Sequence, residues 1–407
     1  MIQLRPHQER IVDSMSTNSK GQVIVPTGGG KTLCMIKDAQ REFNSGNKWG
    51  FLLKEPDRKT IVVVSPRILL TQQHSDDFEE FLGLNPLLQR KILHVHSGET
   101  EHYSTTNSNL IREWNDNNYK YNKLIFTTYH SLHRIQESGI NVDTVYFDEA
   151  HNSVQRHFYP ATEFFATRDH GRCYFFTATP KHSTNVQDPR MNDEEVYGKV
   201  LEQVPAPELV ENGFILPPKV VIKQLEMVKG NQNTHELECE NLVETIDDAN
   251  VDKILICARR TSQITGIISE TDFCTQLKYR GFEWMYITSK TGAVINGKKV
   301  DRETFFDTLT QYGKEEGKRF VVIHHSILSE GINVPGLEAA LFLRNMNFIN
   351  ISQTIGRVIR KGNEQKQFGI VCTPVYDRVG ISTSKRLQAV VDIIFEKGEP
   401  AISVIRR

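Results

Sequence analysis

Short apolar runs alternate with segments of helical period along most of the chain. In the first half, these runs cover residues 23–25, 60–65, 123–128, 144–147 and 172–176. Apolar runs without polar alternation are typical of parallel strands that are buried on both faces. A small group of polar residues follows each run, and in open parallel sheets ligands bind beyond the carboxyl ends of the strands. The pattern therefore predicts a parallel sheet flanked by helices, with a binding site at that edge.

The alternation resumes after a proline-rich stretch at residues 205–219, which we interpret as a domain connection. Further strands are expected at residues 253–258, 284–288, 319–324, 339–343 and 368–372. Residues 232–244 are polar and acidic, which favours a surface loop or a helix, and residues 292–299 favour an exposed turn. We therefore expect an α/β fold with two domains, residues 1–207 and 208–407.

The composition excludes some partners and compartments. The 407 residues carry 49 basic and 50 acidic side chains, a net charge of −1, so binding to nucleic acid would need basic groups gathered in one groove. No apolar run approaches the roughly 18 residues that span a bilayer, and the residues after Met1 do not resemble a signal peptide. The six cysteines are scattered without a C-x-x-C pair. We expect a protein of a reducing, cytoplasmic compartment, without a membrane partner.

Histidines at positions 94, 96 and 102, and the pair at 324 and 325, are candidates for metal ligation. No cysteine or paired acid stands at ligand spacing beside them. We interpret them as core or surface histidines.

Residues 21–32 have the pattern of a phosphate-binding loop. An apolar strand ends at Pro26, Thr27 and three glycines (Gly28, Gly29 and Gly30) form a loop, and Lys31 and Thr32 open a helical segment. Backbone N–H groups and a helix N-terminus favour a phosphate there. Lys31 would reach the β- and γ-phosphates, and the Thr32 hydroxyl would hold Mg²⁺. The general pattern has glycine where Val25 stands, so a glycine turn before an exposed lysine is the alternative.

Two further groups have chemistry suited to nucleotide hydrolysis. Asp148 and Glu149 follow a predicted strand; the first is suited to hold hydrated Mg²⁺ and the second to accept a proton from water. Gln353, Arg357 and Arg360 fall on one face of a predicted helix, where they could clamp developing phosphate charge. Taken alone, the first group would favour a solvated acidic pair and the second a solvated basic face; the phosphate-binding loop is what favours a hydrolysis site.

Two weaker motifs accompany these groups. Residues 177–179 (Thr-Ala-Thr) could bond toward Asp148 and Glu149, and residues 329–335 could bring backbone N–H groups to a phosphodiester. Each is otherwise an ordinary loop or turn.

Taken in order, these motifs resemble those of the superfamily 2 helicases and translocases of the DEAH-like type. The matching segments are residues 4–8, 26–32, 65–67, 127–132, 148–151, 177–180, 329–335 and 353–360. The family also explains Val25, because its phosphate loop is shorter at the front. His151 and Gln353 depart from the DEAD-box RNA helicases. The motifs are most similar to those of phage branch-reversal helicases, RadD-like repair helicases and the motor domains of restriction enzymes.

The resemblance implies two tandem RecA-like domains with ATP and Mg²⁺ in the cleft between them. By this similarity Gln8 reads adenine, and the cofactor-binding residues are Arg5, Gln8, Thr27, Gly28, Gly29, Gly30, Lys31, Thr32 and Gly331. The metal ligands would be Thr32 and Asp148. The catalytic residues would be Lys31, Asp148, Glu149, Gln353, Arg357 and Arg360. The nucleic-acid contacts would be Pro66, Arg67, Thr127, Thr128 and Ser329.

The function expected from this resemblance is an ATP-dependent helicase or translocase. Its partner would be nucleic acid, more readily DNA than RNA, in branched or single-stranded form, in DNA repair or recombination, and the protein would act as a monomer. One alternative is an RNA helicase or remodeller of the same architecture. A second is the motor subunit of a nuclease complex, and a third is a P-loop enzyme acting on a small molecule.

Overall fold

The computed structural model describes residues 3–48, 58–82, 90–225, 234–288, 290–325, 334–343, 348–360, 366, 368–376 and 381–404. The chain divides into two compact units. Unit 1 comprises Met1–Pro26, Gly30–Val204 and Ile402–Arg407, and unit 2 comprises Thr27–Gly29 and Pro205–Ala401. The domain limits expected from the sequence, 1–207 and 208–407, remain a prediction.

Unit 1 is built on a seven-stranded sheet in the order β3-β4-β2-β5-β6-β1-β8, in which every neighbouring pair is parallel. The strands are β1 (Lys20–Ile24), β2 (Thr60–Ser65), β3 (Arg90–Val95), β4 (Asn122–Thr128), β5 (Thr144–Phe147), β6 (Arg172–Thr177) and β8 (Val200–Gln203). All five strands predicted for the first half of the chain form. The two that the sequence did not predict, β3 and β8, are the edges of the sheet, where one-sided burial allows a more polar sequence.

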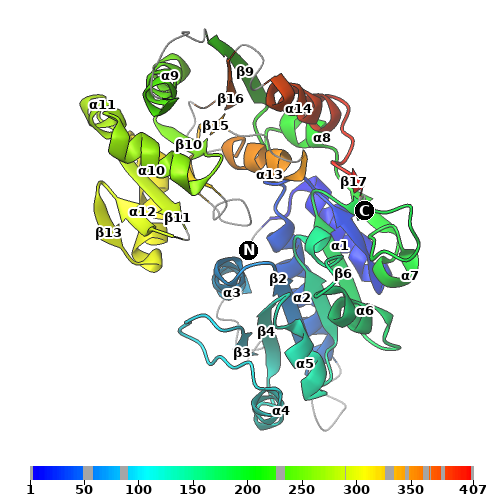
Figure 1. Ribbon diagram of the computed structural model, residues 1–407. Helices are drawn as coiled ribbons and strands as arrows, with labels where there is room; N and C mark the ends of the chain where they lie inside the picture. The colour runs from blue at the N-terminus through cyan, green and yellow to red at the C-terminus, as the bar shows by residue number, and fades with distance from the viewer. Residues whose placement is uncertain are drawn as a thin grey trace. The chain divides into compact units, whose positions relative to one another are not determined.

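Helices flank this sheet (Figure 1). They are α1 (Pro6–Thr17), α2 (Lys31–Lys48), α3 (Ile68–Leu82), α4 (Ser108–Asn117), α5 (Leu132–Ser138), α6 (Tyr159–Thr167) and α7 (Glu194–Tyr197), with a short 3₁₀ turn η2 (Ala150–Asn152). Near the end of the chain, β17 (Ser403–Val404) pairs in parallel with β7 (Lys181–His182). None of the helices in the described ranges combines the length and apolar character needed to cross a membrane.

Unit 2 contains an eight-stranded sheet in the order β13-β12-β11-β14-β10-β15-β16-β9. Its strands are β9 (Pro218–Leu225), β10 (Lys253–Cys257), β11 (Glu283–Thr288), β12 (Gly292–Ile295), β13 (Lys298–Val300), β14 (Phe320–His324), β15 (Ala339–Phe342) and β16 (Gly369–Tyr376). Its helices are α8 (Ala206–Glu211), α9 (Thr234–Ala249), α10 (Thr261–Glu270), α11 (Phe273–Tyr279), α12 (Arg302–Lys314), α13 (Phe348–Val358) and α14 (Ile381–Val391), followed by the π-helical turn η3 (Asp392–Glu396). All five strands predicted for this half form.

Two local expectations for unit 2 are refined. The stretch at 292–299 is part of an antiparallel hairpin, β12–β13, whose tip has positive φ at Asn296 (48°) and Gly297 (82°). An Asn-Gly pair between apolar residues is a strong hairpin signal, so the sequence did contain this information. The acidic stretch after residue 233 is helical, as part of α9. The proline-rich connection contains the short helix α8.

A buried ionic network anchors α2 beneath the sheet of unit 1. Asp38 is fully buried and accepts hydrogen bonds from Tyr146 Oη (2.7 Å) and Arg172 Nη2 (2.9 Å). Arg172 also pairs with Glu42, whose second oxygen accepts a hydrogen bond from Thr144. Tyr146, Arg172 and Thr144 belong to β5 and β6, so these bonds fix the helix that follows the glycine loop against the two central strands.

We predict that Arg172→Met destabilises unit 1 by about 3 kcal/mol, because largely buried Glu42 loses its guanidinium partner and fully buried Asp38 keeps only that of Arg41. Urea unfolding followed by circular dichroism measures this loss. Arg134→Met is the control: Arg134 pairs with Glu137 while both side chains are almost half exposed, so its removal should cost about 0.5 kcal/mol or less. Equal losses of unfolding free energy in the two variants would show that the buried network stabilises unit 1 no more than an exposed ion pair does.

Candidate nucleotide and metal site

The glycine loop has a backbone that requires glycine at two positions. Gly28 and Gly30 have φ values of 91° and 79°, which side chains rarely tolerate. A Cβ atom on Gly30 would also lie 2.3 Å from Gln8 Nε2. Gln8 Nε2 donates a hydrogen bond to the Gly30 carbonyl at 3.2 Å, and Gln8 Oε1 accepts one from the Arg5 N–H at 2.9 Å. The structure therefore packs Gln8 against Gly30 and bonds Gln8 to the backbone of Arg5, while the contact of these residues with a nucleotide remains a prediction.

Lys31 stands at the first residue of α2, beyond the carboxyl end of β1. The first N–H groups of a helix have no intrahelical acceptors, and their dipoles favour an anion there. Lys31 Nζ lies 3.8 Å from Glu149 Oε1, and both side chains are largely buried. Thr32 is the next residue of the same helical turn. The strand order places β1, β6 and β5 side by side, which brings the loop and the acidic pair to one edge of the sheet.

Asp148 is a nearly buried carboxylate with one oxygen satisfied and one not. It follows β5 directly, is 5% exposed, and its Oδ2 accepts a hydrogen bond from His74 Nε2 at 2.9 Å. Its Oδ1 has no hydrogen-bond partner among the described residues. Burial raises the pKa of Asp148, but the hydrogen bond and charge of His74, with the charge of Lys31, outweigh burial and lower it. An ionised oxygen without a hydrogen-bond partner, near the charge of Lys31, is chemically suited to bind Mg²⁺.

Glu149 has a left-handed backbone, with φ of 47°, at the point where β5 passes into η2. Such a conformation costs a non-glycine residue of order 1 kcal/mol and is often found at functional sites. Its Oε2 lies 3.5 Å from His151 Nδ1, and its carbonyl accepts a hydrogen bond from the Asn152 N–H. The turn directs both carboxylates of the acidic pair to the same edge as Lys31.

His151 links the acidic turn to the segment after β6. It is buried, and its Nδ1 lies 3.1 Å from Thr177 Oγ1 and 3.3 Å from Thr179 Oγ1. Burial, together with the positive charges of Lys181 and Lys31, lowers the pKa of His151 to about 3, so the ring is neutral at physiological pH. The two threonines suggested by the sequence therefore reach the acidic turn through His151.

Three other histidines of unit 1 form a separate group. Gly98 N–H donates to His96 Nδ1, so His96 Nε2 carries the proton that bonds His94 Nδ1 at 2.9 Å. His94 Nε2 in turn lies 3.1 Å from Ser75 Oγ, and the ring of His102 stacks on His94. Burial, followed by the proximity of His96 and His102, lowers the pKa of His94 to about 3. No cluster of three or more potential metal ligands occurs within the described ranges.

The arginine face predicted for unit 2 lies on α13 and just beyond it. Gln353 and Arg357 are almost fully buried, and Arg360 forms an antiparallel bridge with Ile215. Lys366 donates hydrogen bonds to the carbonyls of Val358 and Arg360, and burial lowers its pKa to about 8. Whether these arginines complete the phosphate site remains a prediction. Ser329 and Gly331 lie outside the described residues.

The expected nucleic-acid contacts of unit 1 differ in exposure. Arg67 is exposed at the start of α3, and Pro66 is partly exposed. Thr127 Oγ1 donates a hydrogen bond to the Val95 carbonyl, and Thr128 Oγ1 lies within reach of Ser131. Both threonine side chains are buried, which leaves Arg67 as the exposed side chain of this set among the described residues.

Sequence reasoning missed two residues that hold the acidic pair of unit 1: His74 and Tyr129. Tyr129 Oη donates a hydrogen bond to the Asp148 carbonyl at 2.9 Å. His74 shows in the sequence only as a histidine on the apolar side of an amphipathic helix. In unit 2, sequence reasoning also missed Lys366, which bonds the carbonyls of Val358 and Arg360 and has no distinguishing signal in the sequence.

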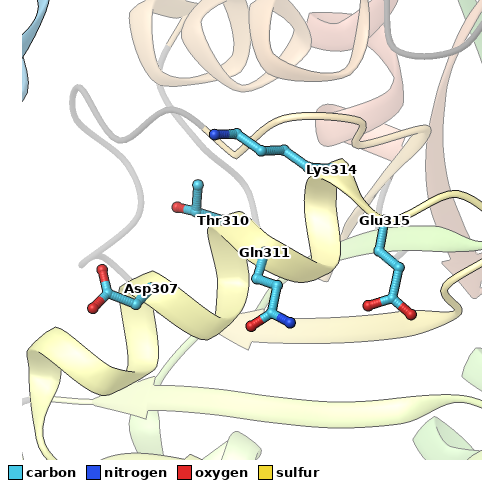
Figure 2. A pocket seen from close by; sticks show the side chains of 5 residues that line it. All are labelled: Asp307, Thr310, Gln311, Lys314 and Glu315. Atoms are coloured by element: carbon cyan, nitrogen blue, oxygen red, sulfur yellow. The ribbon is translucent and has the colours of Figure 1, made fainter.

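A separate open concavity lies along the end of α12 in unit 2. Its lining residues are Asp307, Thr310, Gln311, Lys314 and Glu315. Figure 2 shows Thr310 and Lys314 on one side of the helix and Gln311 and Glu315 on the other. No residue predicted for the nucleotide site lines this concavity.

Comparison with known proteins supports this reading of the fold. Residues 1–182 match the family model described as "Type III restriction enzyme, res subunit". No curated protein matches the chain in sequence.

Three solved structures illustrate the similarity. The ATP-dependent Type ISP restriction-modification enzyme LlaBIII bound to DNA aligns with a TM-score of 0.72 and 17% identity over 99% of this chain and 31% of its own. A nuclease-deletion mutant of the Type ISP enzyme LlaGI with a DNA substrate mimic aligns at 0.66 and 19% identity, over 98% of this chain and 30% of its own. Mss116p bound to ssRNA and AMP-PNP aligns with a TM-score of 0.61 and 15% identity, over 99% of this chain and 75% of its own. The chain thus spans about a third of each restriction enzyme.

The matches confirm the resemblance to superfamily 2 motor domains of restriction enzymes, as well as the α/β, RecA-like fold class. Hydrolysis of ATP by this chain remains a prediction at this point.

We predict that unit 1 loses stability as the pH falls from about 7 to 5. His94 and His151 stay neutral in the folded state down to pH values near 3, whereas in the unfolded chain they bind protons below about 6.5. Protons therefore favour the unfolded state over this range, by at most about 1.4 kcal/mol per pH unit for each histidine. Thermal melts at pH 7, 6 and 5 test this, with His94→Gln expected to show a shallower dependence. Identical slopes in both proteins would contradict it.

Proposed function

We propose that this chain hydrolyses ATP in a reaction stimulated by nucleic acid, and that it uses the energy to move on or remodel DNA. The observation that carries the proposal is the group of Lys31, Asp148 and Glu149 at one edge of the unit 1 sheet. It combines a phosphate-binding lysine, an ionised carboxylate with a partnerless oxygen, and a second carboxylate 3.8 Å from the lysine.

Each residue of the group has a distinct task in the proposed reaction. Mg²⁺, when bound, neutralises charge on the phosphates, and Asp148 Oδ1 with the Thr32 hydroxyl would hold it. Lys31 binds the β- and γ-phosphates, and backbone N–H groups of the glycine loop add to this binding. Glu149 orients the attacking water and accepts its proton. Neutral His151, bonded to Thr177 and Thr179, holds the Glu149 turn in place.

We also propose a contribution of unit 2 to hydrolysis. Arg357 and Arg360, together with Gln353, would stabilise charge that develops on the γ-phosphate, as arginine fingers do. Lys366 supports the proposal, because its bonds to the carbonyls of Val358 and Arg360 fix the backbone that carries these arginines. Burying such a lysine is costly unless its ammonium group is fully bonded.

DNA is the favoured partner because of the similar structures. The two restriction enzymes with TM-scores of 0.72 and 0.66 were solved with DNA or a DNA mimic, whereas Mss116p, at 0.61, was solved with ssRNA. The chain matches only 31% and 30% of those two enzymes, which supports a second candidate function as the motor part of a nuclease complex. Contacts to the phosphate backbone would bind without reading sequence.

We predict that ATP turnover rises at least several-fold on adding single-stranded, duplex or forked DNA, and less with RNA. A steady-state phosphate-release assay across these nucleic acids measures it. A rate that none of them changes would contradict the motor function. A response to RNA alone would favour an RNA remodeller.

Substitutions in the group should separate the proposed roles. Lys31→Ala should reduce turnover by about 10²-fold or more, because the phosphate charge loses its cation. Glu149→Gln should also lower turnover strongly while ATP binding persists. Arg360→Ala should reduce kcat more than nucleotide affinity, and normal turnover in this variant would refute its role. Lys37→Ala, in the same helix as Lys31 but bonded to Gln40, is the control and should behave as wild type.

A further inference from the structure

His74 is placed by helix α3 directly against the carboxylate of Asp148. Its Nε2 lies 2.9 Å from Asp148 Oδ2, and both side chains are nearly inaccessible to solvent. An ionised carboxylate can only accept hydrogen bonds, so Nε2 must carry a proton and donate it. The bond therefore fixes the rotation of the carboxylate and leaves Oδ1 as the oxygen without a partner. Hydrogen bonds of this kind commonly orient a metal ligand.

The next residue of α3, Ser75, holds the helix through a second hydrogen bond. Ser75 Oγ accepts a hydrogen bond from His94 Nε2 at 3.1 Å, and His94 is bonded to His96. Two adjacent residues of α3 are therefore hydrogen-bonded to the sheet: His74 to Asp148, which directly follows β5, and Ser75 to His94 of β3. The helix cannot rotate or slide without disturbing one of these two bonds.

The exposed Arg67 immediately precedes the first residue of the same helix, Ile68. The Arg67 carbonyl accepts hydrogen bonds from the Thr71 N–H at 3.0 Å and from Thr71 Oγ1 at 2.9 Å, so Arg67 is tied to the first turn. His74 lies seven residues further on, roughly 10 Å along the helix axis. Continuous helical backbone therefore connects the residue after Arg67 to His74.

A second connection reaches Asp148 from the segment after β4. Tyr129 Oη donates a hydrogen bond to the Asp148 carbonyl at 2.9 Å, and the Tyr129 N–H donates to the Ser65 carbonyl at 3.1 Å. Tyr129 directly follows Thr128. His74 and Tyr129, which follow the two segments predicted to contact nucleic acid in unit 1, thus each donate one buried hydrogen bond to Asp148.

We propose that His74 is a positioning residue for Asp148, and that α3 couples nucleic acid bound at Arg67 to the metal-binding carboxylate through this histidine. The proposal rests on the proposed function, and it assigns the stimulation of hydrolysis to a particular bond. Without the His74 bond, the carboxylate loses the donor that holds Oδ2. Metal binding then weakens, and nucleic acid at Arg67 no longer acts on it.

The test compares His74→Gln with His74→Asn, which place the same amide group at different distances from the backbone. The amide nitrogen of glutamine can occupy the place of His74 Nε2, whereas the shorter asparagine cannot reach Asp148. We expect His74→Asn to raise the Mg²⁺ concentration for half-maximal binding of a fluorescent non-hydrolysable ATP analogue by about 10–100-fold. His74→Gln should stay within about threefold of wild type. The ratio of DNA-stimulated to basal turnover should fall toward one in the Asn variant and persist in the Gln variant.

Ser75→Ala is the matched control, because it removes the neighbouring bond of the same helix without touching Asp148. It should lower the thermal midpoint while leaving the Mg²⁺ dependence unchanged. If His74→Asn does not fold, His74→Met, which fills a similar volume without a donor, replaces it. Tyr129→Phe is an independent test: removal of the hydroxyl that bonds the Asp148 carbonyl should reduce the ratio of DNA-stimulated to basal turnover.

A wild-type Mg²⁺ dependence in His74→Asn or His74→Met would overturn the proposal, as would an equal shift in Ser75→Ala. Failure of the proposed function has a different signature. In that case the wild-type protein shows no stimulation by DNA or RNA, while the Mg²⁺ titration still reports on His74.

Discussion

The carboxylate of Asp148 is a charge held almost out of contact with water, and the site in unit 1 depends on how that charge is stabilised. A buried ionised group is costly unless it is paired or hydrogen-bonded. His74 and Lys31 supply that stabilisation, enough to lower the pKa of Asp148 despite its burial. One oxygen remains without a partner among the described residues, in the position where a cation would complete the balance. The elements around Asp148 can be understood as the means of holding this arrangement.

The strand order provides the framework. β2 and β6 flank β5, and β1 follows β6, so the loops after these four strands meet at one edge of the sheet. The Asp148 N–H donates to the Val64 carbonyl of β2, which fixes the backbone from the side of α3. Toward the amino ends of these strands, Asp38 and Arg172 hold α2 against β5 and β6. Buried charged groups near both ends of the strands therefore hold the helix that begins with Lys31 and the strand that precedes Asp148 in a fixed relative position.

Much of this fold could be predicted from the sequence because its central strands are buried on both faces. Residues 60–65 and 144–147 are uniformly apolar, and they form β2 and β5. The edge strands β3 and β8 escaped prediction because one-sided burial leaves charged residues such as Arg90 and Lys91 in the strand. Motif spacing indicated Lys31, Asp148 and Glu149. It could not indicate His74, since its partner lies 74 residues away and the pairing depends on strand order.

Binding of Mn²⁺ in place of Mg²⁺, followed by electron paramagnetic resonance with a non-hydrolysable ATP analogue, tests the central claim most directly. Mn²⁺ prefers the same oxygen ligands and gives a signal that distinguishes bound from free ion. The wild-type protein should bind one Mn²⁺ per chain in a nucleotide-dependent manner. Asp148→Asn should weaken that binding by about tenfold or more. Equal Mn²⁺ binding in the two proteins would show that Asp148 is not the metal ligand and that this site does not work as described.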